Sequence, residues 1–329
     1  MNKFKKVGLS ALAGSLVATS AYAGEVTVAG SAGMFLEHIN GGAANSGKSF
    51  SMSNQLTFTG GGELDNGLNV SISFVIDQGD DTTTSVGSGT LAFGGGAPFD
   101  SHSVTVSSDS LGSLTMTGEG MDSASGAVDG TVSGNIWDAF QAAADEPEAA
   151  PGAAGGLNYT LPSVMDDLTV KASYSPQGTN ADSSTAWSVA YAGIDGLSLT
   201  FARGEDNASA ASEADHEVMK ATYAYGPITV GYMESDYNDA VASGDQNTTA
   251  YNVAYTVSDE LSISYGSEEL EFGVQSATNV AAEFERLKVT YVTGGMTLTA
   301  SQASGDNVSY STATTEDREV WALGASFAF

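Results

Sequence analysis

The chain has 329 residues, of which 41% are hydrophobic, with 13 Tyr, 13 Phe and no Cys. This apolar and aromatic content is too high for a disordered chain, and the lack of cysteine excludes a disulfide scaffold or a cysteine metal site. There are 40 Asp and Glu but only 10 Lys and Arg, and the net charge of −30 excludes nucleic acid as a partner.

The first 23 residues read as a secretory signal peptide. The chain begins with a short region that carries three lysines, followed by an apolar stretch over residues 7–19. An A-x-A cleavage site then ends at Ala23, and this is the order of parts in such signals. We therefore expect residues 1–23 to be removed on export and residues 24–329 to form one domain. Because three of the 10 bases lie in the signal, the mature chain carries 7 − 40 = −33.

Beyond the signal, no apolar run approaches the roughly 18 to 20 residues that a transmembrane helix needs. The chain instead alternates apolar with small or polar residues, the period of a strand whose two faces meet different surroundings. In residues 68–76, for example, five apolar residues alternate with Asn69, Ser71 and Ser73. About sixteen such segments are expected. In chain order they cover residues 26–36, 56–58, 68–76, 104–106, 114–116, 157–159, 168–174, 187–191, 197–201, 219–225, 228–232, 251–255, 261–265, 287–291, 296–300 and 321–329.

The connections between these segments are of two kinds. Some are tight turns with Asp, Asn, Gly or Pro, at residues 63–67, 107–112, 193–196, 226–227, 258–260 and 294–295. The alternate connections are longer and polar, at residues 79–100, 204–215, 236–247, 271–282 and 305–317. Short turns at one end and long loops at the other are typical of an outer-membrane β-barrel.

The two faces of the segments also differ. Tyr and Phe lie mainly near segment ends on the apolar face, as in the aromatic girdles of membrane barrels, and Val, Leu, Ile and Ala fill the middle. The opposite face carries Ser, Thr, Asn, Gly and charge, which suits a water-filled interior better than a second packed layer. The alternative is that the aromatic residues form the core of a soluble all-β protein.

Three stretches carry a more specific resemblance. Residues 54–68, residues 111–118 with 157–163, and residues 321–329 resemble parts of the Gram-negative general porins, of the trimeric alphaproteobacterial type. The resemblance implies an all-β, 16-stranded antiparallel transmembrane β-barrel with an inward-folded third outer loop. It implies a homotrimer in the outer membrane, in contact with lipid and lipopolysaccharide, and no catalytic residues. Three aromatic residues resemble the signal read by the barrel-assembly machinery: Trp321, Phe327 and Phe329.

The resemblance places the constriction loop between residues 118 and 156. Seven acidic residues and no Lys or Arg lie within it: Glu119, Asp122, Asp129, Asp138, Asp145, Glu146 and Glu148. In a narrow aqueous pore such charges raise the local concentration of cations. Within residues 135–140, a short helical turn could anchor the loop to the wall through Ile136, Trp137 and Phe140. The alternative is an acidic outer loop that points into solvent.

Strand alternation also places the rare bases. Five of them take the lumen-facing positions: Lys171, Lys220, Arg286, Lys288 and Arg318. Arg203 falls on the outer face near the long-loop end, where it could reach lipid head groups, and Lys48 falls in an expected loop. Bases facing an acidic loop would create a transverse field. Because no base occurs between Lys48 and Lys171, against 16 acids, we expect a cation preference.

Other functions compete with a general diffusion channel. Three scattered histidines and the absence of nucleophile, Walker or dinucleotide motifs argue against an enzyme, a metal site or a cofactor, although loop carboxylates could bind Ca²⁺ opportunistically. An exported acidic structural or adhesive β-protein would share the Gly, Ser and Thr content. A substrate-specific outer-membrane channel would share the barrel.

Overall fold

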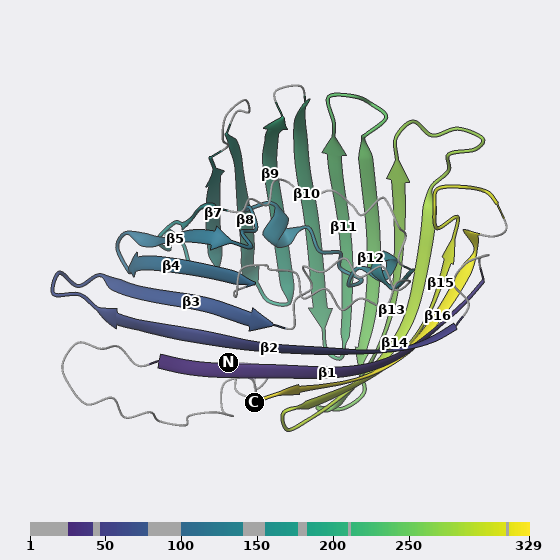
Figure 1. Cartoon of the computed structure of the whole chain (residues 1–329), viewed down its shortest axis with the longest axis horizontal. Helices are drawn as coiled ribbons and strands as arrows, with labels where there is room; N and C mark the ends of the chain where they lie inside the picture. The colour runs from purple at the N-terminus through teal and green to yellow at the C-terminus, as the bar shows by residue number, and fades with distance from the viewer. Residues whose placement is uncertain are drawn as a thin grey trace, which may run out of the picture.

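The computed structural model describes residues 26–41, 47–77, 100–140, 155–176, 183–209, 212–313 and 316–329. Sixteen strands form one closed antiparallel sheet, in which each strand pairs with its sequence neighbours and β1 pairs with β16 (Figure 1). The expected all-β, 16-stranded barrel is thereby confirmed. The predicted signal peptide, residues 1–23, lies outside the described residues.

The strands are β1 (Val26–Asn40), β2 (Gly47–Glu63), β3 (Asn69–Asp77), β4 (Ser101–Ser108), β5 (Gly112–Glu119), β6 (Gly156–Thr160), β7 (Leu168–Ser175), β8 (Ser184–Ile194), β9 (Leu197–Ser209), β10 (Ser212–Tyr225), β11 (Ile228–Asn238), β12 (Gln246–Thr256), β13 (Leu261–Phe272), β14 (Ala282–Thr293), β15 (Met296–Asp306) and β16 (Arg318–Ala328). Two short 3₁₀ helices, η1 (Gly126–Val128) and η2 (Ile136–Phe140), lie between β5 and β6. No helix among the described residues is long and apolar enough to cross a lipid bilayer.

Closure of the sheet brings the two ends of the described chain together. The Gly30 amide donates to the carbonyl of Phe329 at 2.7 Å, and the Phe329 amide donates back to the Gly30 carbonyl at 2.9 Å. The C-terminal residue is therefore held in the β1–β16 seam. A closed sheet has no free edge, so the backbone groups of its strands are paired without help from water.

The alternation of the sequence follows from the two surfaces of this barrel. Large apolar side chains of one parity stand on the outer wall with much of their surface exposed, as for Met219 (47%), Val253 (50%) and Leu287 (52%). Their neighbours of the other parity point to the interior, and several are fully buried there, among them Val218 and Phe284. A continuous exposed apolar wall is costly in water but is what a lipid bilayer requires.

Three boundaries differ from the sequence-based expectation. Residues 204–215 are not a long loop, because β9 continues to Ser209 and β10 begins at Ser212. Lys48 lies in β2, paired with His38 of β1, and not in a loop. Glu119 is the last residue of β5 and pairs with His102. In each case backbone pairing continues through polar sequence in which the apolar alternation has already stopped.

Candidate functional site

Residues 120–140, which we call the inner segment, follow β5 and lie against the inner faces of strands from β7 to β16. The Ala124 amide donates to Ser173 Oγ of β7 at 2.9 Å. Lys220 of β10 donates through Nζ to the Gly130 carbonyl, and Arg318 of β16 donates through Nη1 to the Phe140 carbonyl at 3.1 Å. In Figure 1 the segment runs across the inside of the strands, and η2 at its end contacts β13 to β16. It therefore follows the wall over much of the barrel.

Three inward-facing glycines make room for the inner segment; we call them the glycine seats, and they are Gly231 of β11, Gly266 of β13 and Gly305 of β15. A Cβ added at Gly266 would lie 2.6 Å from Ser133 Cβ, and one added at Gly231 would lie 3.0 Å from Val132 Cβ. A Cβ at Gly305 would lie 2.9 Å from Val308 Cγ2, 3.0 Å from Phe284 Cδ1 and 3.1 Å from Phe140 Cε1, so this glycine makes room for the whole anchor and not for Phe140 alone. Glycine inside a strand often marks the close approach of another chain segment, which is its role here.

An apolar anchor holds the end of the inner segment. Ile136 and Phe140 of η2 are fully buried, and the rings of Phe140 and Phe284 lie 5.2 Å apart. Trp137 packs against the same cluster. The wall side of this cluster comes from β13 to β16 and the β15–β16 loop: Leu270, Ala282, Phe284, Ala303, Val308, Tyr310 and Val320. The helical turn predicted at residues 135–140 is confirmed.

A buried carboxylate of β13, Glu268, binds the middle of the inner segment. Glu268 is only 1% exposed. One oxygen accepts from Ser133 Oγ at 2.7 Å and from Thr131 Oγ1, and the other accepts from the Trp137 amide at 3.0 Å. A buried carboxylate is tolerated only when its oxygens are satisfied in this way. Glu268 was not predicted as a site residue, because strand parity was applied to the bases alone, although the same parity places Glu268 inside and Glu269 outside.

Three of the five predicted pore-wall bases contact the backbone of the inner segment. Besides Lys220 and Arg318, Arg286 donates through Nη2 to the carbonyls of Ser133 and Gly134, the latter at 3.1 Å. Lys171 of β7 is exposed and Lys288 of β14 is half-buried, both on the inner face. The expected arrangement of bases across the pore from the acidic loop is therefore wrong for Lys220, Arg286 and Arg318, which lie behind it.

The predicted acids are distributed differently. Asp122 and Asp138 of the inner segment are exposed, while Asp129 at the end of η1 is partly buried. Burial and the nearby Asp122 carboxylate raise the pKa of Asp129 from 3.8 to about 6, although Lys220 opposes the shift. Asp145, Glu146 and Glu148 lie outside the described residues. No group of three or more Asp, Glu or His side chains in the described ranges is arranged to hold a metal ion.

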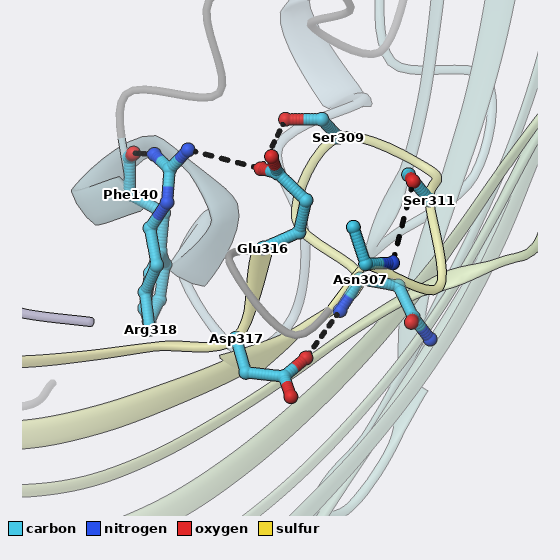
Figure 2. A network of polar contacts seen from close by, with 8 residues as sticks. Phe140, Asn307, Ser309, Ser311, Glu316, Asp317 and Arg318 are labelled. Carbon is cyan, nitrogen blue, oxygen red and sulfur yellow. Dashed lines mark hydrogen bonds and ion pairs between the residues drawn. The ribbon is translucent and has the colours of Figure 1, made fainter. Parts of the chain in front are cut away.

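A polar network joins the end of the inner segment to the β15–β16 loop (Figure 2). Arg318, which binds the Phe140 carbonyl through Nη1, also binds Glu316 Oε2 through Nη2 at 3.1 Å. Ser309 Oγ donates to the same Glu316 oxygen at 2.8 Å, and the Asn307 amide donates to Asp317 Oδ1 at 3.4 Å. Arg318 therefore links the segment to a loop at the mouth of the barrel.

The inner wall that the described inner segment leaves uncovered is rich in hydroxyl groups. Thr105 Oγ1 of β4 and Thr115 Oγ1 of β5 lie 2.8 Å apart on this wall. Strand pairing places further hydroxyls on the inward positions of β2 to β4: Ser51, Ser53, Thr57, Thr59, Ser71, Ser73 and Ser103. No Lys or Arg occurs between Lys48 and Lys171, so this wall holds no inward base.

Comparison with known proteins agrees with this architecture. The family model described as "Gram-negative porin" matches residues 8–329, whereas a search of curated protein sequences found no match. A porin structure refined at 1.8 Å superposes with a TM-score of 0.66 at 17% identity, covering 93% of this chain and 100% of that one. The anion-selective porin from Comamonas acidovorans gives 0.64 at 18% identity, covering 93% and 99%. A loop-deletion mutant of OmpT, an outer membrane protein of Vibrio cholerae, gives 0.66 at 14% identity, covering 93% and 99%.

These identities are low, so the solved structures establish the shared barrel fold. The family match, in contrast, extends over nearly the whole sequence. The chain therefore belongs to the Gram-negative porin family, and it is a channel protein of the bacterial outer membrane.

Proposed function

We propose that this protein is a general diffusion porin, a passive channel for small hydrophilic solutes that prefers cations. The observation that carries the proposal is the placement of charge around the inner segment. The bases Lys220, Arg286 and Arg318 are turned onto its backbone carbonyls, while the carboxylates of Asp122 and Asp138 are exposed. Solutes in the lumen then meet these carboxylates and, on β2 to β5, a hydroxyl wall without inward bases. Lys171 and Lys288 are the inward bases left off the segment, and the balance of charge favours cations.

Family membership does not decide the sign of the selectivity, because one structural neighbour is an anion-selective porin. The proposal is tested by the reversal potential of single channels in planar bilayers under a KCl gradient. We expect a potential of the sign given by K⁺ permeation. A reversal potential of the sign given by Cl⁻ permeation would contradict the proposed cation preference. The absence of any conductance would contradict the proposal that the protein is a diffusion channel.

We further propose a homotrimer in which neighbouring copies meet through β1 to β5. Every Tyr of the chain other than Tyr22 lies after residue 158, so the outer wall of β1 to β5 lacks the tyrosines that line lipid interfaces. That wall instead exposes Met34 (57%) and Met52 (60%). Flexible methionines suit contact with another protein surface.

The absence of native cysteine makes the trimer test simple. Met34→Cys should cross-link to a neighbouring copy with a short bismaleimide, whereas Val253→Cys, on the tyrosine-bearing side, should stay a single band on a denaturing gel. Cross-linking of Val253→Cys alone would place the interface elsewhere.

Three further predictions about partners stay predictions. They are contact with lipopolysaccharide, opportunistic Ca²⁺ binding by loop carboxylates, and recognition by the barrel-assembly machinery of Trp321, Phe327 and Phe329.

A further inference from the structure

Within the described strands, the inner wall of β1 to β5 carries a single aromatic side chain, Phe35 of β1. Phe35 lies on the same face as Ile39, which packs against the apolar anchor, and about 13 Å from Ile39 toward the short-turn end. Its neighbours in register are Ser51 of β2 and Gly324 of β16. The ring is partly exposed on a wall of hydroxyl groups, so its apolar surface is available to a solute in the lumen.

Two glycines make room for this ring. A Cβ added at Gly33 would lie 2.6 Å from Phe35 Cε2, and one added at Gly324 would lie 2.9 Å from Phe35 Cδ1. The ring therefore covers both glycines, and Gly33 is buried. The same two Cβ positions lie 2.6 Å from Ser53 Oγ and from Thr299 Oγ1, so hydroxyl groups lie beside the ring. A ring held along the wall in this way turns its free face to the lumen.

A carboxylate without a neighbouring base stands next to the ring. Glu37 follows Phe35 by two residues on the same face of β1, about 7 Å along the strand. Its neighbours in register are Ser49 of β2 and Ala322 of β16, so neither adjacent strand places a base beside it. Glu37 is partly exposed. The lumen therefore offers an aromatic face and a negative charge within reach of one small solute.

We propose that Phe35 and Glu37 form a site for a small organic cation with a quaternary ammonium group. The ammonium lies on the free face of the ring, where cation–π attraction acts, and the Glu37 carboxylate balances its charge. Methyl groups cover the charge of such a cation, so it gives up water more readily than K⁺. The Glu37 charge favours a cation over a neutral sugar on the same ring and repels an anion. The site rests on the proposed function, because a solute reaches Phe35 only through the cation-preferring lumen.

The test measures how tetramethylammonium, the probe for this class, slows the K⁺ current. Purified mature protein conducts in a planar bilayer while tetramethylammonium chloride replaces KCl at constant total salt. A cation held at the ring delays the ions behind it, so the conductance should fall steeply at low replaced fractions and then level off. The midpoint of this curve gives the affinity. In Phe35→Leu, which keeps the glycines covered but has no π face, the midpoint should rise about two- to fivefold, the ratio that an exposed cation–π contact supplies.

Matched variants separate the site from the rest of the barrel. Phe35→Tyr keeps an aromatic face and should keep the wild-type midpoint. Glu37→Gln removes the charge and should raise the midpoint, whereas Glu319→Gln, on the outer face of β16, should not. Phe58→Leu makes the same exchange as Phe35→Leu on the outer face of β2 and should leave the midpoint unchanged.

The proposal is overturned by a conductance that falls only in proportion to the fraction replaced, or by equal midpoints in the wild type and Phe35→Leu. It is also overturned if Phe58→Leu shifts the midpoint as much as Phe35→Leu, or if glucose slows the current through Phe35 and tetramethylammonium does not. All of these outcomes leave a K⁺-preferring channel in KCl alone, so the proposed function would stand. A wild type that does not conduct in KCl alone would overturn the proposed function, and the site with it.

Discussion

Replacing Glu268 with Gln should loosen the inner segment without unfolding the barrel. The carbonyl oxygen of Gln can still accept from Ser133 and Thr131, but its NH₂ group then faces the Trp137 amide, which also donates. One hydrogen bond is lost with a buried N–H left unpaired, and two charge-assisted bonds become neutral, a total of about 3 kcal/mol. Arg286 also loses a nearby opposite charge.

The apolar anchor at Ile136 and Phe140 remains in this variant, with about 1.5–3 kcal/mol for each fully buried side chain. The segment should therefore stay on the wall for most of the time. A loss of about 3 kcal/mol raises the population of detached states by roughly a hundredfold. In single-channel recordings this should appear as added current noise and brief transitions to other conductance levels.

The matched control is Glu269→Gln, one residue along the same strand. Glu269 is exposed on the opposite parity and should leave the recordings unchanged. Both variants should show the wild-type shift in gel mobility on heating. Recordings of Glu268→Gln as quiet as those of Glu269→Gln would refute the reasoning that this carboxylate holds the segment.

Three further changes test the site. Gly266→Val should push the inner segment away from β13 and alter the conductance, because even a Cβ would lie 2.6 Å from Ser133 Cβ; Gly60→Ala, which meets only ordinary contacts of 3.5 Å or more, should not. Asp122→Asn combined with Asp138→Asn should reduce the K⁺ preference in reversal potentials, whereas Asp109→Asn, in the β4–β5 turn, should have no effect. Asp129 gains its proton as the pH falls through about 6, so the K⁺ preference should weaken between pH 7 and pH 5, and a drop of equal size in Asp129→Asn would contradict this assignment.

The fold could be predicted from the sequence because lipid and water select opposite residues along every strand. The pattern found sixteen strands even where a segment such as residues 114–116 offered only two apolar positions. It failed at the strand ends. Residues 204–209 carry polar groups on both faces because they lie beyond the apolar band, yet their backbone still pairs in β9. Hydrophobic alternation marks only the part of a strand that faces lipid, whereas the backbone pairing of the same strand continues beyond that part.

The site was less predictable, for a different reason. Parity alone placed Lys220 and Arg286 on the inner face, but their binding to the backbone carbonyls of residues 130–134 depends on the path of the inner segment. The same holds for Glu268 and for the glycine seats. Inward glycines at Gly231, Gly266 and Gly305 were a usable signal, since glycine inside a strand often marks the close approach of another chain segment, and here three alternate strands each carry one.

The glycine seats make the length and residue order of the inner segment depend on the order of the barrel strands. They lie on alternate strands and receive, in order, Val132, Ser133 with Ile136, and Phe140. Adding or deleting one residue between Val132 and Phe140 would put bulky groups against strands that have no space for them. Engineers who wish to resize the aperture should therefore exchange side chains on the solvent side of residues 120–140 and keep the length of this stretch constant.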